Sequence, residues 1–457
     1  MKRIFYAMVV AVVALVMPSC ASDASEVLDT IPADAQMVAM IDAASAMKHF
    51  GVEVDADGLT FAPEIQNVKS LIDKAIPAEE QKNVAQKMSA FMAIIDVENI
   101  AGYFSADETV YFTTMVKNEG LLEKTLAENG VTKSQVAGFD CYKLDGRLYM
   151  LVKDAQAWIV EREGDAEKLK KELDKASSNP ITSNTTVCEY LDQDNDVNAV
   201  ASTKQMNIEE LGKDGWIRAS ANMKGTGVEA TLSAVKSDGN VVDFSEYLGE
   251  INDDVLQYIP QKSMLAVALG IDSNMKWDLL DKVLATMSYG DRATAELFRP
   301  YIESIDGSVL LTVSPAVEGV TPQMMQSPDA WEMKFMAHMP QDKIDGAIEK
   351  IVSTIEADYR ITLPREGNFY SIPNPEMPMK VGSHNGYFVI AKGGIDVTAS
   401  NENMKRVMSG ARVAAALKGE NIMPALKAMD WTLRVEDKEV KVSLSFKLSG
   451  NLVDYML

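Results

Sequence analysis

The side chains that most often carry out catalysis are few and scattered in this chain of 457 residues. The three histidines are His49, His338 and His384, and none lies three or four residues from another histidine or from a cysteine, as a local zinc site requires. No Gly-x-Ser-x-Gly stretch, which marks the nucleophile of many hydrolases, occurs. These residues predict neither a zinc site nor a hydrolase of that type.

One short motif keeps a hydrolase as an alternative. Ser45 and Lys48 have the Ser-x-x-Lys spacing of penicillin-interacting serine enzymes, although the accompanying Ser-Asp-Asn and Lys-Thr-Gly elements are missing. The 67 acidic residues also allow many carboxylate pairs for glycan hydrolysis without favouring any one of them. We therefore favour a protein without enzyme activity. The alternative is a secreted hydrolase that acts on envelope or dietary glycan or peptide.

An acidic segment has the spacing of a calcium loop, which offers oxygen ligands at alternate positions, a glycine at the bend and a closing glutamate. The matching residues are Glu53, Asp55, Asp57, Gly58 and Glu64. Position 1 is usually aspartate, and Pro63 stands inside the loop. The alternative is an exposed acidic turn before a helix, with Glu64 near the positively polarised start of that helix. No other metal and no cofactor is expected.

Seven of the 16 prolines fall in two connections, at 315–328 and 364–378. Long irregular connections in compact domains often carry function. Aromatic and histidine side chains border them and form our candidate ligand or partner surface. These residues are Trp331, Phe369, Tyr370 and His384. The alternative is that prolines stiffen exposed loops and the aromatic side chains pack beneath them.

The first 19 residues have the features of a signal peptide. Lys2 and Arg3 precede an apolar run, residues 4–17, that is too short for a comfortable membrane-spanning helix. The following Val-Met-Pro-Ser-Cys string, which ends at Cys20, resembles the lipobox of bacterial lipoproteins, in which a cysteine is acylated and becomes the new N-terminus. It departs from the common pattern at Met17 and Pro18, and ordinary cleavage after Ala21 is the alternative.

Acylation at Cys20 would hold the protein on a membrane, since each buried methylene contributes about 0.8 kcal/mol and two or more chains anchor stably. Residues 20–26 would then be a short lipidated linker. The other cysteines are Cys141 and Cys188, which an oxidising compartment would allow to form a disulfide. Cys141 falls in a predicted strand and is also interpretable as a small buried side chain.

The charge of the chain argues against nucleic acid as a partner. Lys and Arg number 44 and Asp and Glu 67, a formal net charge of −23, and no run of basic residues occurs. Such a chain repels phosphate backbones. Apolar residues make up 47% and charged residues 24%, an ordinary mixture for globular domains.

The chain contains two copies of one pattern. Val27–Pro32 is similar to Val255–Pro260, and Trp216 with its following hairpin is similar to Trp431 with its own. The two landmarks are separated by 228 and 215 residues, so their order and spacing are kept. We predict two tandem related units, at residues 27–248 and 249–457.

The elements between these landmarks indicate the fold class. Short strands joined by tight turns, with helices inserted in blocks, are typical of a mainly antiparallel α+β sheet with helices packed on one side. The predicted helices are 64–76, 77–91, 118–129, 343–356 and 401–408, and the cap at Asp165 predicts one more. The predicted strands and hairpins are 37–42, 109–116, 139–143, 148–153, 155–161, 216–235, 264–272, 331–339, 386–392, 395–399 and 431–448.

The N-terminal pattern, the Ile31–Ala35 stretch before a strand and the doubled layout resemble a group of uncharacterised two-repeat bacterial envelope lipoproteins. The resemblance implies location and architecture and supplies no catalytic residue. It implies a lipid-anchored protein of the cell envelope, periplasmic or surface-facing at the outer membrane. We expect a binding or structural role, with the membrane as one partner through the N-terminal lipid and an envelope protein or glycan as another.

Overall fold

The computed structural model describes residues 24–55, 58–144, 147–205, 214–272, 296, 299–316, 327–373, 378–423 and 426–448. The chain divides into two compact units, and the change from unit 1 to unit 2 falls between Val242 and Asp243. Cys20 and the predicted signal peptide lie outside the described residues. No helix in the described ranges has the length and apolar character needed to cross a membrane.

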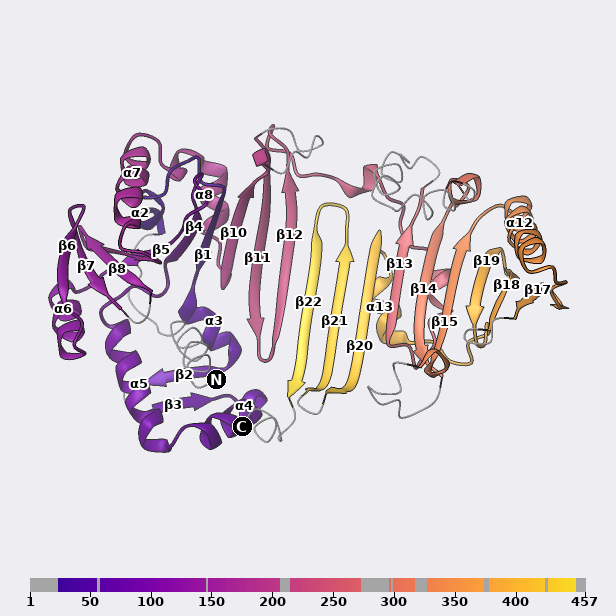
Figure 1. Cartoon of the computed structure of the whole chain (residues 1–457), viewed down its shortest axis with the longest axis horizontal. Coiled ribbons are helices and arrows are strands. Elements are labelled where there is room, and N and C mark those ends of the chain that lie inside the picture. Colours follow the sequence, from indigo (N-terminus) through magenta and orange to yellow (C-terminus); the bar gives the residue numbers. More distant parts are fainter. Residues whose placement is uncertain are drawn as a thin grey trace. The chain divides into compact units, whose positions relative to one another are not determined.

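Unit 1 is built on one large antiparallel sheet (Figure 1). Its described strands pair in the order β12-β11-β10-β1-β4-β5-β9-β8-β7-β6. Their bounds are β1 (Met37–Ile41), β4 (Ile100–Phe104), β5 (Val110–Met115), β6 (Lys133–Val136), β7 (Phe139–Lys143), β8 (Tyr149–Lys153), β9 (Gln156–Val160), β10 (Val197–Ser202), β11 (Trp216–Lys224) and β12 (Gly227–Val235). A separate hairpin joins β2 (Val52–Asp55) to β3 (Gly58–Phe61).

Three of the helices of unit 1 begin after polar residues that cap them. Asn118 and Asn184 each accept a hydrogen bond from a backbone amide three residues on, and Asp42 does the same for the amide of Ser45. The helices are α2 (Ala24–Leu28), α3 (Ala43–Phe50), α4 (Gln66–Ala75), α5 (Ala78–Met92), α6 (Glu119–Glu128), α7 (Asp165–Ser178) and α8 (Thr185–Leu191). Short 3-10 turns are η1 (Pro63–Ile65), η2 (Ile181–Ser183) and η3 (Thr203–Gln205).

The described strands of unit 2 are also antiparallel and pair in the order β22-β21-β20-β13-β14-β15-β19-β18-β17-β16. Their bounds are β13 (Leu265–Gly270), β14 (Ser308–Pro315), β15 (Trp331–His338), β16 (Arg365–Glu366), β17 (Phe369–Ile372), β18 (Met379–His384), β19 (Tyr387–Lys392), β20 (Val413–Met423), β21 (Leu426–Val435) and β22 (Val440–Leu448). The helices are α9 (Asp253–Leu256), α12 (Gln341–Tyr359) and α13 (Glu402–Met408), with 3-10 turns η5 (Phe244–Glu246) and η7 (Pro328–Ala330). The predicted strand at 395–399 is wrong, because these residues form bends and an irregular connection.

The Ile-Pro motif makes the same contacts in both units. The carbonyl of Ile31 accepts a hydrogen bond from the amide of Ile181 at 2.8 Å, and the carbonyl of Ile259 accepts one from the amide of Asn401 at 2.9 Å. Pro32 also forms an isolated antiparallel bridge with Pro180, and Pro260 forms one with Ser400. Both isoleucines are fully buried. The motif therefore ties the start of each unit to the segment that precedes β10 or β20.

The second sequence landmark, the tryptophan that begins each predicted hairpin, is displaced by one residue between the two units. Met37 and Leu265 each lie six residues after the isoleucine of the motif and pair with Ala201 and Leu417. Ala201 pairs with Ile217, whereas Leu417 pairs with Trp431. Trp431 thus corresponds to Ile217, and the predicted match with Trp216 is wrong. Because side chains alternate along a strand, the two tryptophans lie on opposite faces of their sheets.

Helices pack on both faces of each sheet, so the predicted packing on one side is wrong. In unit 2, Met336 packs with α9 and α13, while its neighbour Ala337 packs with α12 on the opposite face. In unit 1, Trp158 belongs to the cluster under α2 and α7, and its neighbour Ala157 belongs to the cluster under α6. The reason is that these strands are apolar on both faces, so each face needs a cover.

Candidate functional site

One face of the sheet in unit 2 carries apolar side chains in three rows that cross β22, β21, β20, β13, β14 and β15. We call these residues the apolar face of unit 2. The first row is Leu444, Trp431, Leu417, Leu265, Val313 and Met333; the second is Val442, Leu433, Ala415, Val267, Leu311 and Phe335; the third is Val440, Val435, Val413, Leu269, Val309 and Ala337.

The strand register of unit 1 produces the corresponding apolar face. We define the apolar face of unit 1 by three rows across β12, β11, β10, β1, β4 and, in the first two rows, β5. The first row is Ala234, Ile217, Ala201, Met37, Phe104 and Val110; the second is Leu232, Ala219, Ala199, Ala39, Gly102 and Phe112; the third is Ala230, Ala221, Val197, Ile41 and Ile100.

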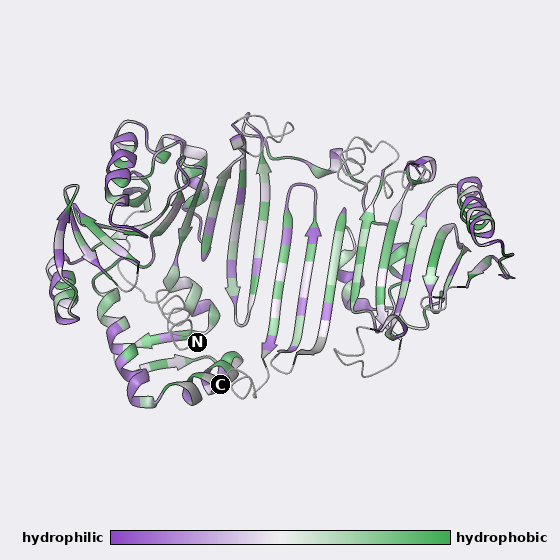
Figure 2. Ribbon diagram, in the orientation of Figure 1, coloured by the Kyte–Doolittle hydropathy of each residue, from purple (hydrophilic) through white to green (hydrophobic). Residues whose placement is uncertain are grey.

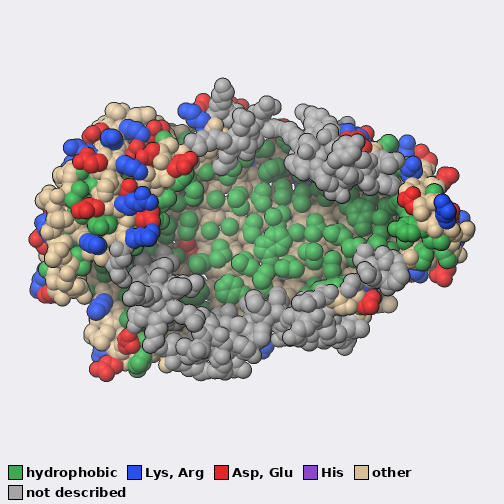
Figure 3. Space-filling model, viewed as in Figure 1, with side chains coloured by type: hydrophobic (Ala, Val, Ile, Leu, Met, Phe, Trp, Pro, Cys, Tyr) green, Lys and Arg blue, Asp and Glu red, His purple; other side chains and the backbone are tan. Residues whose placement is uncertain are grey.

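The opposite face of β21 and β22 is polar, which shows on which side of the sheet the apolar rows lie. Along β22, Val442 and Leu444 alternate with Ser443 and Ser445, and hydropathy alternates likewise along β21 (Figure 2). α13 packs against β20 and β21 on the side of the buried core that contains Ala414 and Ala416. In Figure 3 hydrophobic side chains gather over the strands of each unit. The apolar rows therefore lie on the side away from α13.

These side chains are incompletely covered. In unit 1, Met37, Val110 and Phe112 are 45%, 49% and 45% exposed. In unit 2, Trp431 and Leu433 are half-buried and belong to none of the hydrophobic clusters of the described residues. Fully burying one large apolar side chain contributes about 1.5–3 kcal/mol, and extended apolar patches on a protein surface usually mark a binding site.

Neighbouring elements cover only the margins of each face. α12 packs over Phe335 and Val309 in unit 2. In unit 1, the cluster of α3, β2 and α5 covers Ile41 and Ile100. The inner strands already pair on both edges, so a bound molecule cannot join them as an added strand. Binding on this surface must use side-chain contact.

The four aromatic and histidine residues predicted as one surface are not brought together. Phe369 packs against the core under α9 and α13, whereas the next residue, Tyr370, packs against the cluster under α12. Consecutive strand residues point to opposite faces, so these two cannot share a surface. His384 packs edge-on against Tyr258 with ring centroids 5.5 Å apart. Trp331 begins β15 beside Pro315.

The predicted calcium segment forms part of the hairpin of β2 and β3. Glu53 pairs with Thr60 in that hairpin, Asp57 lies outside the described residues, and Glu64 falls in the 3-10 turn η1. The calcium pattern describes a loop between helices, and this segment is a turn between strands. No group of three His, Cys, Asp or Glu side chains in the described ranges is placed to hold a metal. Calcium binding here remains a prediction.

In the described part of the chain, neither Ser45, the candidate nucleophile of the alternative hydrolase, nor the two cysteines form the arrangements considered from the sequence. Ser45 lies in the first turn of α3, and the hydrogen bonds of the described residues include none from its hydroxyl to Lys48 or His49. His49 instead contacts the buried Asp196, with Nδ1 and Oδ1 2.7 Å apart. Among the residues that the structure describes, no disulfide joins Cys141, which is buried, to Cys188, which is half-buried.

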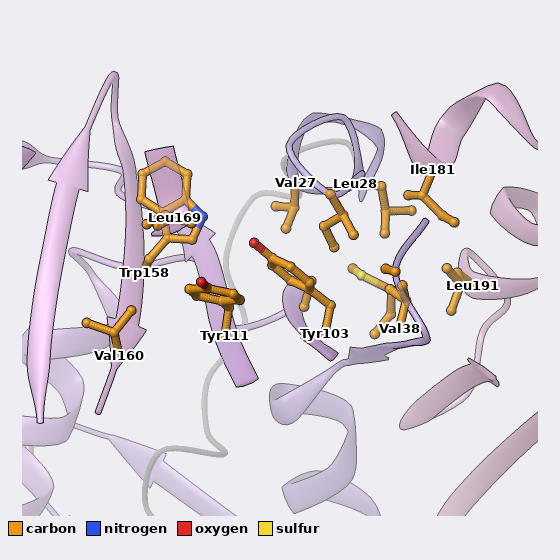
Figure 4. Packing of buried hydrophobic residues seen from close by; sticks show 14 of the residues in the cluster. Val27, Leu28, Val38, Tyr103, Tyr111, Trp158, Val160, Leu169, Ile181 and Leu191 are labelled. Atoms are coloured by element: carbon orange, nitrogen blue, oxygen red, sulfur yellow. The ribbon is translucent and has the colours of Figure 1, made fainter. Parts of the chain in front are cut away.

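A buried polar group in unit 1 was not expected from the sequence. The hydroxyl of Tyr103, the indole nitrogen of Trp158 and Oε2 of Glu172 are buried without a hydrogen-bond partner in the described part of the chain. The ring of Tyr103 stacks on Tyr111 at 5.0 Å, and burial raises the pKa of both tyrosines. Figure 4 shows both hydroxyls and the indole nitrogen on the same side of the strands. Such groups in proteins are commonly bridged by ordered water.

Unit 2 buries a lysine at the position that corresponds to Tyr111. The side chain of Lys334 is 3% exposed, its ammonium donates to the carbonyl of Ile395, and it lies 5.9 Å from the ring centroid of Tyr258. Burial lowers the pKa of Lys334 to about 8, against the opposing effect of Asp396. Neither group could be recognised as buried from its local sequence, because the strand register decides it.

Comparison with known proteins adds little. No protein-family model matches the sequence, and no curated protein matches it. Among solved structures, crystal form IV of TP0453 aligns with a TM-score of 0.28 and 10% identity over 46% of this chain and 80% of TP0453. Crystal form I of TP0453 aligns with a TM-score of 0.28 and 11% identity over 50% of this chain and 83% of the other. These scores are too low to support an argument about fold or function.

Proposed function

We propose that this protein is an exported, lipid-anchored protein of the cell envelope that binds an apolar partner or ligand on the apolar faces of its two units. The role is binding and not catalysis. The single observation that carries the proposal is the unbroken series of apolar rows across six strands of unit 2, which no described helix covers at Trp431 or Leu433.

The proposal includes two tandem related units that arose by duplication. The identical order of strands in both sheets supports this, as do the equivalent hydrogen bonds of Ile31 and Ile259. A chance repetition would not be expected to keep both a strand order and a non-local contact. The one-residue displacement of the tryptophan landmark is compatible with duplication, since the strand pairing and not the tryptophan defines the correspondence.

The location rests on the lipobox-like string before Cys20. Mass spectrometry of the mature N-terminus, after expression in a bacterium that processes lipoproteins, tests it. We expect an acylated Cys20 as the first residue and membrane release by the Cys20→Ser variant. An unmodified residue after position 20 at the N-terminus would refute the anchor and leave the binding proposal intact.

Binding to the apolar face is tested with a fluorescent apolar dye on the soluble mature chain. The Leu444→Asp variant places a charge in the first row of unit 2, and the matched Ser445→Asp variant places the same charge on the polar face of the same strand. We expect L444D to remove the part of the dye fluorescence that the face of unit 2 contributes and S445D to leave the fluorescence unchanged. Equal dye binding by both variants would argue against the apolar face as the binding surface.

A further inference from the structure

The apolar face of unit 2 has the chemistry of a hydrocarbon-binding surface. Apart from the indole nitrogen of Trp431, its three rows offer no polar side-chain atom. A peptide or a glycan placed there would leave its own donors and acceptors without partners, at a penalty of about 1–3 kcal/mol for each group. A hydrocarbon chain loses no hydrogen bonds on binding and gains the transfer free energy of each methylene.

The size of the face also fits. Six strands at about 4.8 Å spacing span about 24 Å, which exceeds the thickness of about 15 Å that the acyl chains of one leaflet occupy in a bilayer of about 30 Å. An acyl chain lying across the strands along one row therefore fits within the face. Shorter apolar groups, such as one protein side chain, would occupy only part of it.

A positive charge stands at the end of one row. Strand pairing continues the first row from Met333 to Lys392 on β19, so that residue lies at the margin of the apolar face. Its side chain is only 10% exposed, and its ammonium is 3.9 Å from the carboxylate of Asp329, which is 83% exposed. A phosphate that reaches Lys392 would therefore take the place of this exposed carboxylate. A hydrocarbon row that ends at a cation complements a molecule with an acyl chain joined to a phosphate.

We propose that the apolar face of unit 2 binds a phospholipid, with an acyl chain along the rows and the phosphate near Lys392. The inference rests on the proposed function, because the predicted lipid anchor, whose linker residues 24–26 belong to α2, would keep the protein at a membrane, where phospholipids are abundant. It goes further by naming the ligand class.

The test is titration of the soluble mature chain with phosphatidylethanolamine that carries bromine on its acyl chain, which quenches nearby tryptophan fluorescence. We expect saturable quenching that is largely lost in the conservative Trp431→Phe variant. Leu433→Asp should weaken binding at least tenfold, while Ser445→Asp stays within twofold of wild type. Lys392→Gln should weaken binding of the phospholipid severalfold and leave binding of a brominated fatty alcohol unchanged. Circular dichroism confirms that each variant is folded.

Distinct results separate this inference from the proposed function. If the apolar dye binds and Leu444→Asp lowers its fluorescence while the phospholipid does not quench, the phospholipid proposal falls and apolar binding stands. If neither dye nor phospholipid binds, both fall. If quenching persists fully in Trp431→Phe, the lipid lies elsewhere and the site is wrong. If the wild-type chain is a dimer that Leu433→Asp dissociates, a second copy occupies the face and the proposal is overturned.

Discussion

The two units share an order of strands but line their apolar faces with side chains of different size. Unit 1 has alanine at 201, 219 and 234, where unit 2 has leucine at 417, 433 and 444. The buried side of the central strands stays tightly packed in both. A core side chain must fit fixed neighbours, whereas a side chain on an open face has none to fit. The comparison teaches that the framework is set by the helix-covered core, and that the open face is free to differ between the units.

A charge is reversed at one equivalent position. Asp196 stands directly before β10, and Arg412 stands directly before β20. The carbonyl of Asp196 accepts a hydrogen bond from the amide of Asp42, just after β1, at 2.9 Å, and the carbonyl of Arg412 accepts one from the amide of Gly270, the last residue of β13, at 2.8 Å. Oδ2 of Asp196 accepts from the amide of Met223 at 2.6 Å. Nη1 of Arg412 donates to the carbonyl of Leu248 at 2.6 Å. The position directly before the strand is thus held by an acidic side chain in unit 1 and by a basic side chain in unit 2.

The largest effect should come from the shared motif. Ile31→Ala and Ile259→Ala each remove a fully buried side chain and should each lower the free energy of unfolding by about 2–5 kcal/mol. Urea unfolding followed by circular dichroism measures both. Similar losses would sharpen the correspondence of the units, and a neutral result at either position would break it.

A smaller effect should appear where Tyr111 in unit 1 corresponds to Lys334 in unit 2. The pKa of Lys334 is about 8 in the folded chain against 10.5 as its ordinary value. Between these values the unfolded chain binds the proton and the folded chain does not, so wild-type stability rises with pH. Lys334→Met should therefore be more stable than wild type at pH 7, by at most about 3 kcal/mol, and the difference should vanish near pH 10.5.

Tyr111→Phe provides the matched control for Lys334→Met. Burial keeps the pKa of this tyrosine above its ordinary range, so its hydroxyl stays neutral throughout the titration. Its effect on stability should be within about 1 kcal/mol and the same at pH 7 and pH 9, below the ordinary tyrosine pKa at which the unfolded chain begins to ionise. A pH-dependent difference for Tyr111→Phe, or none for Lys334→Met, would contradict the burial of these groups on the helix-covered face.

The reversed charges should act in the same direction and to a similar extent. Asp196→Ala leaves the amide of Met223 without its acceptor and should lower stability by about 1–3 kcal/mol. Arg412→Met should lower it by about 1 kcal/mol, since its partner Asp437 is 67% exposed. His49→Ala, at a half-exposed residue, is the control and should have a smaller effect than Asp196→Ala. Thermal unfolding ranks the stabilities of the three variants. If Asp196→Ala leaves stability unchanged, the two positions do not have the same structural role.

The smallest effect should come from giving the apolar face of unit 1 a larger side chain of the kind found in unit 2. Ala219→Leu adds a side chain to the open face of unit 1 and should change stability by less than about 0.5 kcal/mol, whereas overpacking a closed core costs about 1–3 kcal/mol. Ala166→Leu, in the closed core under α7, is the matched control and should show that larger loss. Equal losses in urea unfolding would mean that the face of unit 1 is packed.

Local sequence predicted most of the individual elements. The predicted helices at 118–129 and 401–408 form, each capped by an asparagine, and the alternating segments after Trp216 and Trp431 form hairpins. These signals depend on hydrogen bonds within a few residues and on alternation along one strand, so they can be recognised without the fold. The prediction of a strand at 395–399 is wrong because a short apolar run does not show whether a partner strand lies beside it.

The candidate site could not be predicted in the same way. The apolar face contains no motif; it forms because Leu265, Leu417 and Trp431, far apart in the chain, fall in one register row. The predicted surface of Phe369 and Tyr370 failed for the same reason, since residues adjacent in the chain point to opposite faces of a sheet.

Sequence by itself determined the composition, the export-like start and the repeated Ile-Pro motif, and it predicted strands such as 37–42 and 264–272. Only the tertiary structure decided which side of those strands the helices cover and which side they leave open. The physical reason is that periodicity reports how much of a strand is apolar, while the partner of each face is chosen by contacts between segments far apart in the chain.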